Sequence, residues 1–324
     1  MIRIAVDAWN LVDDRRGMGR YVRRVLTDWQ LEPDLEVTLL VRKARHATLL
    51  TQEFPYHART DTGGSYDVVW YPWNAMRFAI RGARSVALFH DPFAFTFPHS
   101  NVIARWREQS PIRRALARAD HRSANSAWTA REFARLFGID AQAFAVIHPV
   151  PDPWWQPVEP KQHTPFILAV AGPEERKNIP TLRKAFARAF PARDCSLLIA
   201  GNSPYANIHP DDTELRALYS GALGVAVPSS AEGYGLMAVE AMACGAPVIA
   251  SDASALPEAC DGAATLVPPF DVNAWALALR EIADDGSLRE SMRERSLARA
   301  ARIDRSEPAR LTLALLQRAL GSAR

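Results

Sequence analysis

Two successive runs of short apolar segments alternating with amphipathic helical patterns are the strongest constraint on this 324-residue chain. Strands that are apolar throughout are buried on both faces, and their alternation with helices is typical of a mostly parallel sheet covered by helices. Between the runs, prolines at 149, 151, 153, 157, 160 and 165 disfavour any regular element. The pattern predicts an α/β protein with two Rossmann-like domains, and the length suits two domains of roughly 150 residues.

The first run predicts strands at residues 2–6, 37–41, 68–70, 86–89 and 145–147, and helices at about 20–29, 102–118 and 129–137. The second predicts strands at 166–170, 196–200, 225–227, 247–250 and 264–267, and helices at 179–190, 212–220, 236–244, 272–284 and 287–302. We therefore expect an N-terminal domain at 1–150, a linker at 151–164 and a C-terminal domain at 165–305. A final helix at 306–324 can cross back to the N-terminal domain.

Composition excludes several classes of protein. With 48% hydrophobic and 23% charged residues, the chain is neither disordered nor fibrous, and a net charge of +3 does not call for a nucleic-acid partner. Cys195, Cys244 and Cys260 lack metal-ligand spacing and are expected as small core residues in a reducing compartment. The N-terminus has no signal-peptide pattern, and no window approaches the roughly 20 apolar residues of a membrane span. These features predict a cytoplasmic protein.

The segment 228–251, PSSAEGYGLMAVEAMACGAPVIAS, contains the most informative motif. A strand ends at Pro228, a loop with two glycines follows, and a helix begins near Gly235. The backbone N–H groups of Gly235, Leu236 and Met237 would point out of the helix start, where a phosphate is favoured. Glycine also lets a ligand approach the backbone closely. The segment therefore predicts an anion site at the carboxyl end of a strand.

Two glutamates flank this predicted anion site. Glu240 lies just over one turn inside the helix, where its carboxylate can accept hydrogen bonds from the paired hydroxyls of a ribose. Glu232 precedes the glycines and can reach the other side of the phosphate. Spacing alone is equally compatible with a surface loop and a helix bearing two solvated glutamates.

The long segment closely resembles the donor-site motif of retaining glycosyltransferases of family 4. Two glutamates separated by seven residues, here Glu232 and Glu240, and Glu-Gly-x-Gly-Leu starting at Glu232 carry the resemblance. It implies the GT-B fold, in which an acceptor-binding N-terminal domain and a nucleotide-sugar-binding C-terminal domain face a central cleft. The implied donor-binding residues of this segment are Gly233, Tyr234, Gly235, Leu236, Met237 and Glu240, and Glu232 is implied to contact the transferred sugar.

The segment 172–178 is similar to the family's loop that supplies an arginine and a lysine to the donor diphosphate. Lys177 matches the lysine, whose charge would neutralise phosphate oxygens. Pro173 stands where the basic residue after the glycine is usual, so the arginine is in doubt, and Arg176 is the candidate replacement. An Arg-Lys dipeptide alone would more often be a solvated surface pair.

Two segments of the first half extend the resemblance. Residues 16–21 contain Gly17 and Gly19 and resemble the glycine loop that meets the donor phosphate. A lone G-x-G is usually only a turn, but this one follows the first strand and opens a helix. His90 ends a strand at the position where similar enzymes place a histidine beside the transferred sugar. Without that context, a lone histidine is more often structural.

The resemblance implies a hexosyltransferase acting on a nucleotide-sugar donor and a saccharide or lipid-linked acceptor. Residues 90–98 look most like bacterial surface-polysaccharide mannosyltransferases, so GDP-mannose is the first candidate donor. No Asp-x-Asp motif is present, and we expect neither a metal ion nor another cofactor. A stretch that helps to hold the base is short between 202 and 215, so the base stays open. The alternatives are a nucleotide-sugar epimerase of the same fold and a non-catalytic nucleotide-sugar binder.

Residues 102–122 combine an apolar stripe with six arginines, namely Arg105, Arg107, Arg113, Arg114, Arg118 and Arg122. Four of them, Arg107, Arg114, Arg118 and Arg122, are expected at helical spacing. One interpretation is an ordinary domain helix with its arginines in water. The other is a basic face for anionic lipid, as in many similar enzymes, which predicts a protein peripheral on the inner face of the membrane.

Overall fold

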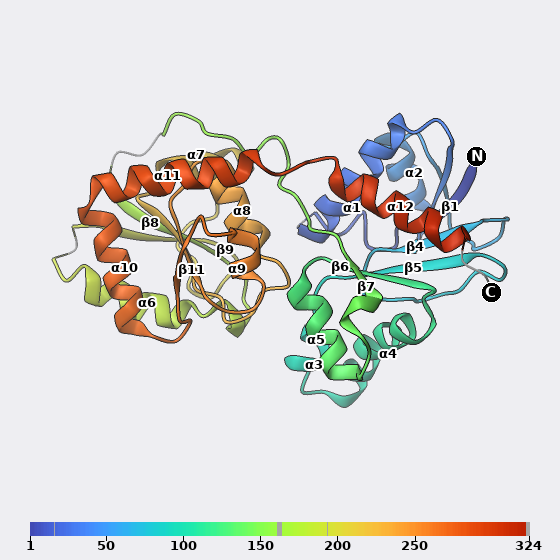
Figure 1. Ribbon diagram of the computed structural model, residues 1–324, viewed down its shortest axis with the longest axis horizontal. Helices are drawn as coiled ribbons and strands as arrows, with labels where there is room; N and C mark the ends of the chain where they lie inside the picture. Colours follow the sequence, from blue (N-terminus) through green and yellow to red (C-terminus); the bar gives the residue numbers. More distant parts are fainter. Residues whose placement is uncertain (16, 161–163, 193, 322–324) are drawn as a thin grey trace. The chain divides into compact units, whose positions relative to one another are not determined.

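The computed structural model describes residues 1–15, 17–160, 164–192 and 194–321 (Figure 1). Arg16 of the expected glycine loop, residues 161–163 of the expected linker and residues 322–324 of the expected final helix lie outside this set. The chain divides into two compact units. Unit 1 comprises Met1–Pro149 and Ser306–Arg324, and unit 2 comprises Val150–Arg305.

Unit 1 is built on a parallel sheet, to which the described residues contribute seven strands in the order β3-β2-β1-β4-β5-β6-β7. The strands are β1 (Ile2–Asp7), β2 (Leu35–Leu40), β3 (His57–Arg59), β4 (Val68–Tyr71), β5 (Arg84–Phe89), β6 (His121–Ala124) and β7 (Phe144–Val146). After β3 the chain returns to place β4 on the other side of β1. The neighbouring carboxyl ends of β1 and β4 therefore form the crossover point at which such sheets bind ligands.

Helices cover both faces of this sheet (Figure 1). One face packs against α1 (Gly17–Asp28), α2 (Ala44–Glu53) and α12 (Glu307–Gly321), and the other against α3 (Phe93–Thr96), α4 (Val102–Arg118) and α5 (Ala127–Phe137). The last helix, α12, is anchored by polar contacts as well as by its apolar face. Trp29 Nε1 donates to the carbonyl of Ala309 at 3.1 Å, and the hydroxyls of Tyr21 and Thr312 lie 3.4 Å apart.

Unit 2 has a parallel sheet in the order β12-β11-β10-β8-β9. Its strands are β8 (Phe166–Ala171), β9 (Ser196–Gly201), β10 (Gly224–Val227), β11 (Val248–Ser251) and β12 (Thr265–Val267). The helices α7 (Asp212–Gly221), α8 (Leu236–Ala243) and α9 (Leu256–Cys260) pack into one core. A second core contains α6 (Ile179–Ala189), α10 (Val272–Asp284) and the start of α11 (Gly286–Ala301). Cys195, Cys244 and Cys260 are buried and unbridged.

The proline-rich segment packs against unit 2 as far as residue 160. Trp155 is 1% exposed, and its ring centroid lies 5.7 Å from that of Tyr219 in α7. Arg216, also in α7, donates from Nε to the carbonyl of Gln156 at 2.9 Å. The prolines thus prevent regular structure here, but the described part of the expected linker belongs to unit 2.

One expectation about the arginine-rich helix is wrong. The helix α4 ends at Arg118, and Arg122 lies in β6, where its Nε and Nη2 donate to the carbonyl of Leu116 at 2.9 and 2.6 Å. The chain turns out of the helix at Ala119, which has an extended conformation. Arg122 therefore ties a strand to the preceding helix and does not continue the helical row.

Candidate functional site

The loop between β10 and α8 ends at a glycine, and the helix begins directly after it. Gly235, directly before α8, has φ of 109°. A Cβ added there would lie 2.6 Å from Leu256 Cδ2, which no ordinary contact allows. The positive φ favours glycine at 235, and a Cβ there would also have to displace the Leu256 side chain. Leu236 and Met237, which supply the first N–H groups of α8, are only partly buried. Because the first N–H groups of a helix have no partner within the helix, this position favours an anion.

Next to this helix start, the structure brings together three of the expected residues. Lys177 Nζ donates to Glu232 Oε1 at 2.7 Å. Arg176 Nη1 donates to the carbonyl of Ala231 at 3.0 Å and to Glu232 Oε2 at 3.3 Å. The three side chains are only 11–16% exposed. The solvated-pair interpretation of Arg176 and Lys177 therefore does not hold, since both cations converge on one carboxylate.

The charges of this cluster decide the protonation of Glu232. Burial alone would raise the pKa of its carboxyl, but the positive charges of Lys177 and Arg176, with hydrogen bonds from Lys177 and Ser229, hold that pKa below its usual value. Glu232 is thus ionised at neutral pH. A buried carboxylate bound to two cations is a poor general acid, but it is well fixed to accept hydrogen bonds from a ligand.

Two residues that the sequence analysis missed hold the cluster in place. Asn178 adopts the left-handed conformation with φ of 53°, and its Nδ2 donates to the carbonyls of Pro228 at 3.1 Å and Pro269 at 2.6 Å. The backbone N–H of Glu232 donates to Ser254 Oγ at 2.8 Å. The available signal for Asn178 was its position before Ile179-Pro180 at a helix start, where asparagine tolerates positive φ.

The other residues of the motif differ in exposure. Glu240 is in α8 and 6% exposed, and Gly233 is buried. Tyr234 is 4% exposed, and its ring packs with Val239 and Ala259. Burial raises the pKa of Tyr234 to about 12, so its hydroxyl stays protonated. The side chain of Tyr234 is part of the core, so only its backbone is available to bind a nucleotide-sugar donor.

In unit 1, His90 stands at the carboxyl end of β5 and is 5% exposed. Its Nε2 lies 2.7 Å from the carbonyl oxygen of Pro72, which can only accept, so Nε2 carries the proton. Burial lowers the pKa of His90 to about 4, against the opposing effects of Pro72 and Asp14. The ring is therefore neutral at physiological pH and is oriented by the loop after β4.

The expected glycine loop of unit 1 opens α1. Gly17 is exposed at the first position of the helix, and Gly19 is buried. A Cβ at Gly19 would lie 1.9 Å from the carbonyl oxygen of Asp14. Glycine is thus required at 19 because two backbone segments pass close together there. Gly17 takes no part in this contact.

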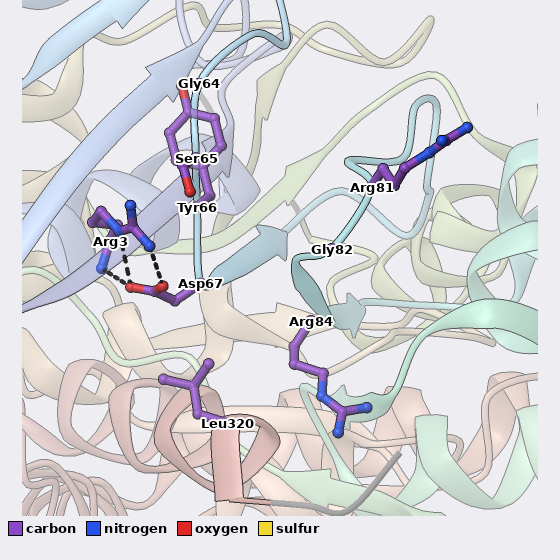
Figure 2. A pocket seen from close by; sticks show the side chains of 9 residues that line it. All are labelled: Arg3, Gly64, Ser65, Tyr66, Asp67, Arg81, Gly82, Arg84 and Leu320. Carbon is purple, nitrogen blue, oxygen red and sulfur yellow. Dashed lines mark hydrogen bonds and ion pairs between the residues drawn. The ribbon is translucent and has the colours of Figure 1, made fainter.

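A cavity of about 390 Å³ lies at the amino ends of β1, β4 and β5 in the unit 1 sheet (Figure 2). Its side chains include Arg3, Asp67, Arg81 and Arg84. Figure 2 shows the guanidinium of Arg3 turned to Asp67, at 2.7 Å from Oδ1, while Arg81 extends away from that pair. The amino ends of parallel strands do not carry the ligand sites of such sheets, and none of the expected site residues lines this cavity.

Across the described part of the chain, no group of three or more His, Cys, Asp or Glu side chains is arranged to hold a metal ion. Among the described residues, no helix combines the length and the apolar character needed to cross a membrane.

Comparison with protein families gives two matches that together extend over most of the chain. Residues 15–153 match the family described as Glycosyltransferase Family 4, and residues 206–299 match the family described as Glycosyl transferases group 1. The second match includes Glu232, Gly235 and Glu240, and the first includes Gly17, Gly19 and His90.

Curated relatives are also glycosyltransferases. The O-antigen chain mannosyltransferase B of Escherichia coli is 27% identical over 282 residues, which cover 75% of this chain and 73% of that protein. The D-inositol 3-phosphate glycosyltransferase of Corynebacterium jeikeium is 44% identical over 91 residues, but this match covers only 28% of this chain and 22% of the relative.

Solved structures resemble the whole chain at low identity. Anabaena Alr3699/HepE in complex with UDP and glucose aligns with a TM-score of 0.75 and 16% identity, covering 98% of this chain and 100% of that one. WaaG, a glycosyltransferase involved in lipopolysaccharide biosynthesis, aligns with a TM-score of 0.68 and 13% identity over 97% of this chain and 99% of its own.

Proposed function

Because the chain belongs to glycosyltransferase family 4 and has the GT-B type of fold, we propose that it transfers a hexose from a nucleoside-diphosphate sugar to a saccharide or lipid-linked acceptor. GDP-mannose is the first candidate donor, because a relative that matches 75% of this chain is a mannosyltransferase. Biosynthesis of a bacterial cell-surface polysaccharide is the proposed pathway, and the transferred sugar keeps its anomeric configuration.

The cluster of Arg176, Lys177 and Glu232 beside the glycine-started helix α8 is the observation that carries this proposal. In the proposed complex, the donor diphosphate lies at the start of α8 and draws Lys177 from Glu232. Arg176 and the Ser254 hydroxyl then keep Glu232 in position, so its carboxylate can accept hydrogen bonds from the sugar. Glu240, deeper in α8, binds the ribose.

The reaction is a substitution at the anomeric carbon. The bond from this carbon to the diphosphate oxygen breaks, a bond to the acceptor oxygen forms on the same face, and the acceptor proton passes to the departing phosphate. Negative charge grows on the diphosphate, where Lys177 and the α8 amides stabilise it without reorganisation. This reaction needs no metal ion. His90 is buried and neutral, which suits orientation of the sugar better than proton transfer.

Membrane association is a separate part of the proposal. Around the start of α4, four apolar side chains are unusually exposed, with exposed fractions of 52–67%: Phe97, Val102, Ile103 and Trp106. Arg107 and Arg118 of the same helix are exposed as well. Aromatic and aliphatic groups next to arginines suit an anionic bilayer surface. We therefore propose that the enzyme is cytoplasmic and peripheral on the inner face of the membrane.

The experiment that tests the transferase is incubation with a panel of GDP-, UDP- and ADP-sugars together with a lipid and oligosaccharide extract. Transfer predicts nucleoside diphosphate release that depends on the extract, a product anomeric centre like that of the donor by NMR, and activity that survives EDTA. An isomerised nucleotide sugar would support the epimerase instead. Donor binding without chemistry would support the binder, and an inverted linkage would contradict the retaining mechanism.

A further inference from the structure

The loop that follows β8 contains a carboxylate that the proposed function does not use. This loop starts at Gly172 and supplies Arg176 and Lys177 to the cluster around Glu232. It also contains Glu174, whose side chain is 43% exposed. A glutamate is unexpected in a loop that is proposed to bind a diphosphate, because like charges brought together weaken binding.

The side chain of Glu174 turns back onto the first residue of the loop. A Cβ added to Gly172 would overlap Glu174 Oε2, and it would lie 3.1 Å from Cδ and 3.4 Å from Oε1 of the same carboxylate. The carboxylate therefore covers the face of Gly172 that has no side chain. A phosphate oxygen could approach the backbone most closely on this face, at the carboxyl end of β8.

Glu174 also shares a cation with Glu232. Arg176 Nη2 is 3.7 Å from Glu174 Oε1, while Nη1 of the same guanidinium donates to Glu232 Oε2 at 3.3 Å. Lys177 completes the group through its bond to Glu232. Two positive side chains are thus matched by two negative ones, so the net charge of the group is zero. A diphosphate gains the full attraction of Arg176 only when one carboxylate moves away.

We propose that Glu174 competes with the donor diphosphate, so that the donor and the departing nucleoside diphosphate bind by displacing its carboxylate from Arg176 and Gly172. This inference rests on the proposed transferase function and identifies a residue that limits the affinity of its nucleotide site. Glu174 is the carboxylate that moves, because its ion pair is long and its side chain is more exposed than that of Glu232. Arg176 Nη2 then turns to a phosphate oxygen while Nη1 stays on Glu232. The carboxylate returns as the product leaves, which favours release of the nucleoside diphosphate.

The test is titration calorimetry on the full chain with GDP, UDP and inorganic pyrophosphate as the probes. Glu174→Gln keeps the length of the side chain and removes its charge. Each probe that binds wild type should therefore bind this variant about two- to fivefold more tightly at low salt, the range expected for an exposed ion pair. The gain should shrink at high salt, because exposed charges are screened. A purely structural role of Glu174 predicts weaker binding, so the direction of the change separates the two roles.

Glu175→Gln is the matched control, since it removes the same charge from the next residue, which is also exposed, and should leave the affinities unchanged. Equal gains by both variants would assign the effect to the net charge of the loop, and no gain with Glu174→Gln would leave an ordinary surface ion pair. Either result overturns the inference. Tighter pyrophosphate binding by Glu174→Gln, without binding of GDP or UDP, would remove the transferase proposal and leave the competition standing. If neither protein binds any of the three probes, both proposals are wrong.

Discussion

Lys177 Nζ and Glu232 Oε1 lie 2.7 Å apart, although 55 positions separate the two residues in the chain. The contact arises because β8 and β10 are neighbours in a parallel sheet, so the loops after them meet at one edge. A lysine that is compensated by a carboxylate can be buried without a ligand, which keeps it in place for the donor. The predictions on the donor side follow from this pair.

Lys177→Ala should lower turnover more than it lowers nucleoside binding. Its charge acts on the diphosphate as the leaving group develops charge, and loss of one preorganised electrostatic contact typically costs about 10²–10³ in rate. Steady-state rates and calorimetric affinities for the nucleoside diphosphate measure the two effects. Lys184→Ala removes an exposed lysine of α6 and serves as the control. Activity of Lys177→Ala within a few-fold of wild type would move the role to Arg176.

Glu240→Ala should weaken binding of the nucleoside diphosphate. The ribose hydroxyls lose a charged acceptor, which costs on the order of 1–3 kcal/mol. Calorimetry gives the affinity, and thermal unfolding checks the fold, because Glu240 is buried. The control is Glu290→Ala, which removes an exposed carboxylate of α11. If a folded Glu240→Ala protein binds as tightly as wild type, the ribose assignment is wrong.

His90 should make the free energy of unfolding depend on acid pH. Its pKa is about 4 in the folded protein against 6.5 for the free side chain, so below pH 6.5 the unfolded state binds a proton that the folded state refuses. The contribution of neutral His90 is fully present above pH 6.5 and is lost as the pH falls toward 4. Asp7, with a pKa raised to about 6, contributes in the opposite direction.

Urea titrations of wild type and His90→Gln between pH 7 and pH 4 isolate this effect. The difference between their free energies of unfolding should shrink as the pH falls, since only wild type carries the titrating ring. A difference that stays constant over this range would show that His90 is not held neutral by burial.

The fold was predictable from the sequence wherever periodicity was strong. All the strands of the unit 2 sheet fall at apolar runs, and the Gly235 turn could be located from its glycines. The strands β3 and β6 were missed because their sequences, HAR and HRSA, carry no apolar run. They form because the neighbouring strands offer a paired edge, which is a tertiary effect.

Pairings between distant residues were not predictable in the same way. The sequence indicated Lys177 and Glu232 as separate ligands of a donor, and nothing in their spacing shows that they meet in the ligand-free protein. Arg114 illustrates the same limit on a helix, since its Nη1 donates to the carbonyls of Met76 and Arg77 at 3.2 and 3.3 Å. Helical spacing predicts the face of a side chain but not the loop that covers it.

The final prediction concerns the surface around the start of α4. Arg114 is engaged with carbonyls, and the Arg113 guanidinium lies 5.0 Å from the Phe95 ring centroid and 5.3 Å from that of Phe137. Lipid contact should therefore depend on Trp106, Arg107 and Arg118, with each arginine contributing about 1 kcal/mol at low salt. We expect wild type to sediment with phosphatidylglycerol vesicles at low salt and to be released at high salt.

A variant combining Trp106→Ser, Arg107→Gln and Arg118→Gln should remain in the supernatant at both salt concentrations. Its control, Arg81→Gln with Arg295→Gln, removes the same charge from exposed positions outside α4 and should sediment as wild type does. The net charge of the whole molecule is only +3, so removing two arginines anywhere could change vesicle binding. This control therefore distinguishes an effect of the α4 surface from an effect of net charge. Equal sedimentation of both variants would indicate a non-specific effect of charge. If wild type also stays in the supernatant at low salt, the membrane contact is wrong and a soluble acceptor is favoured.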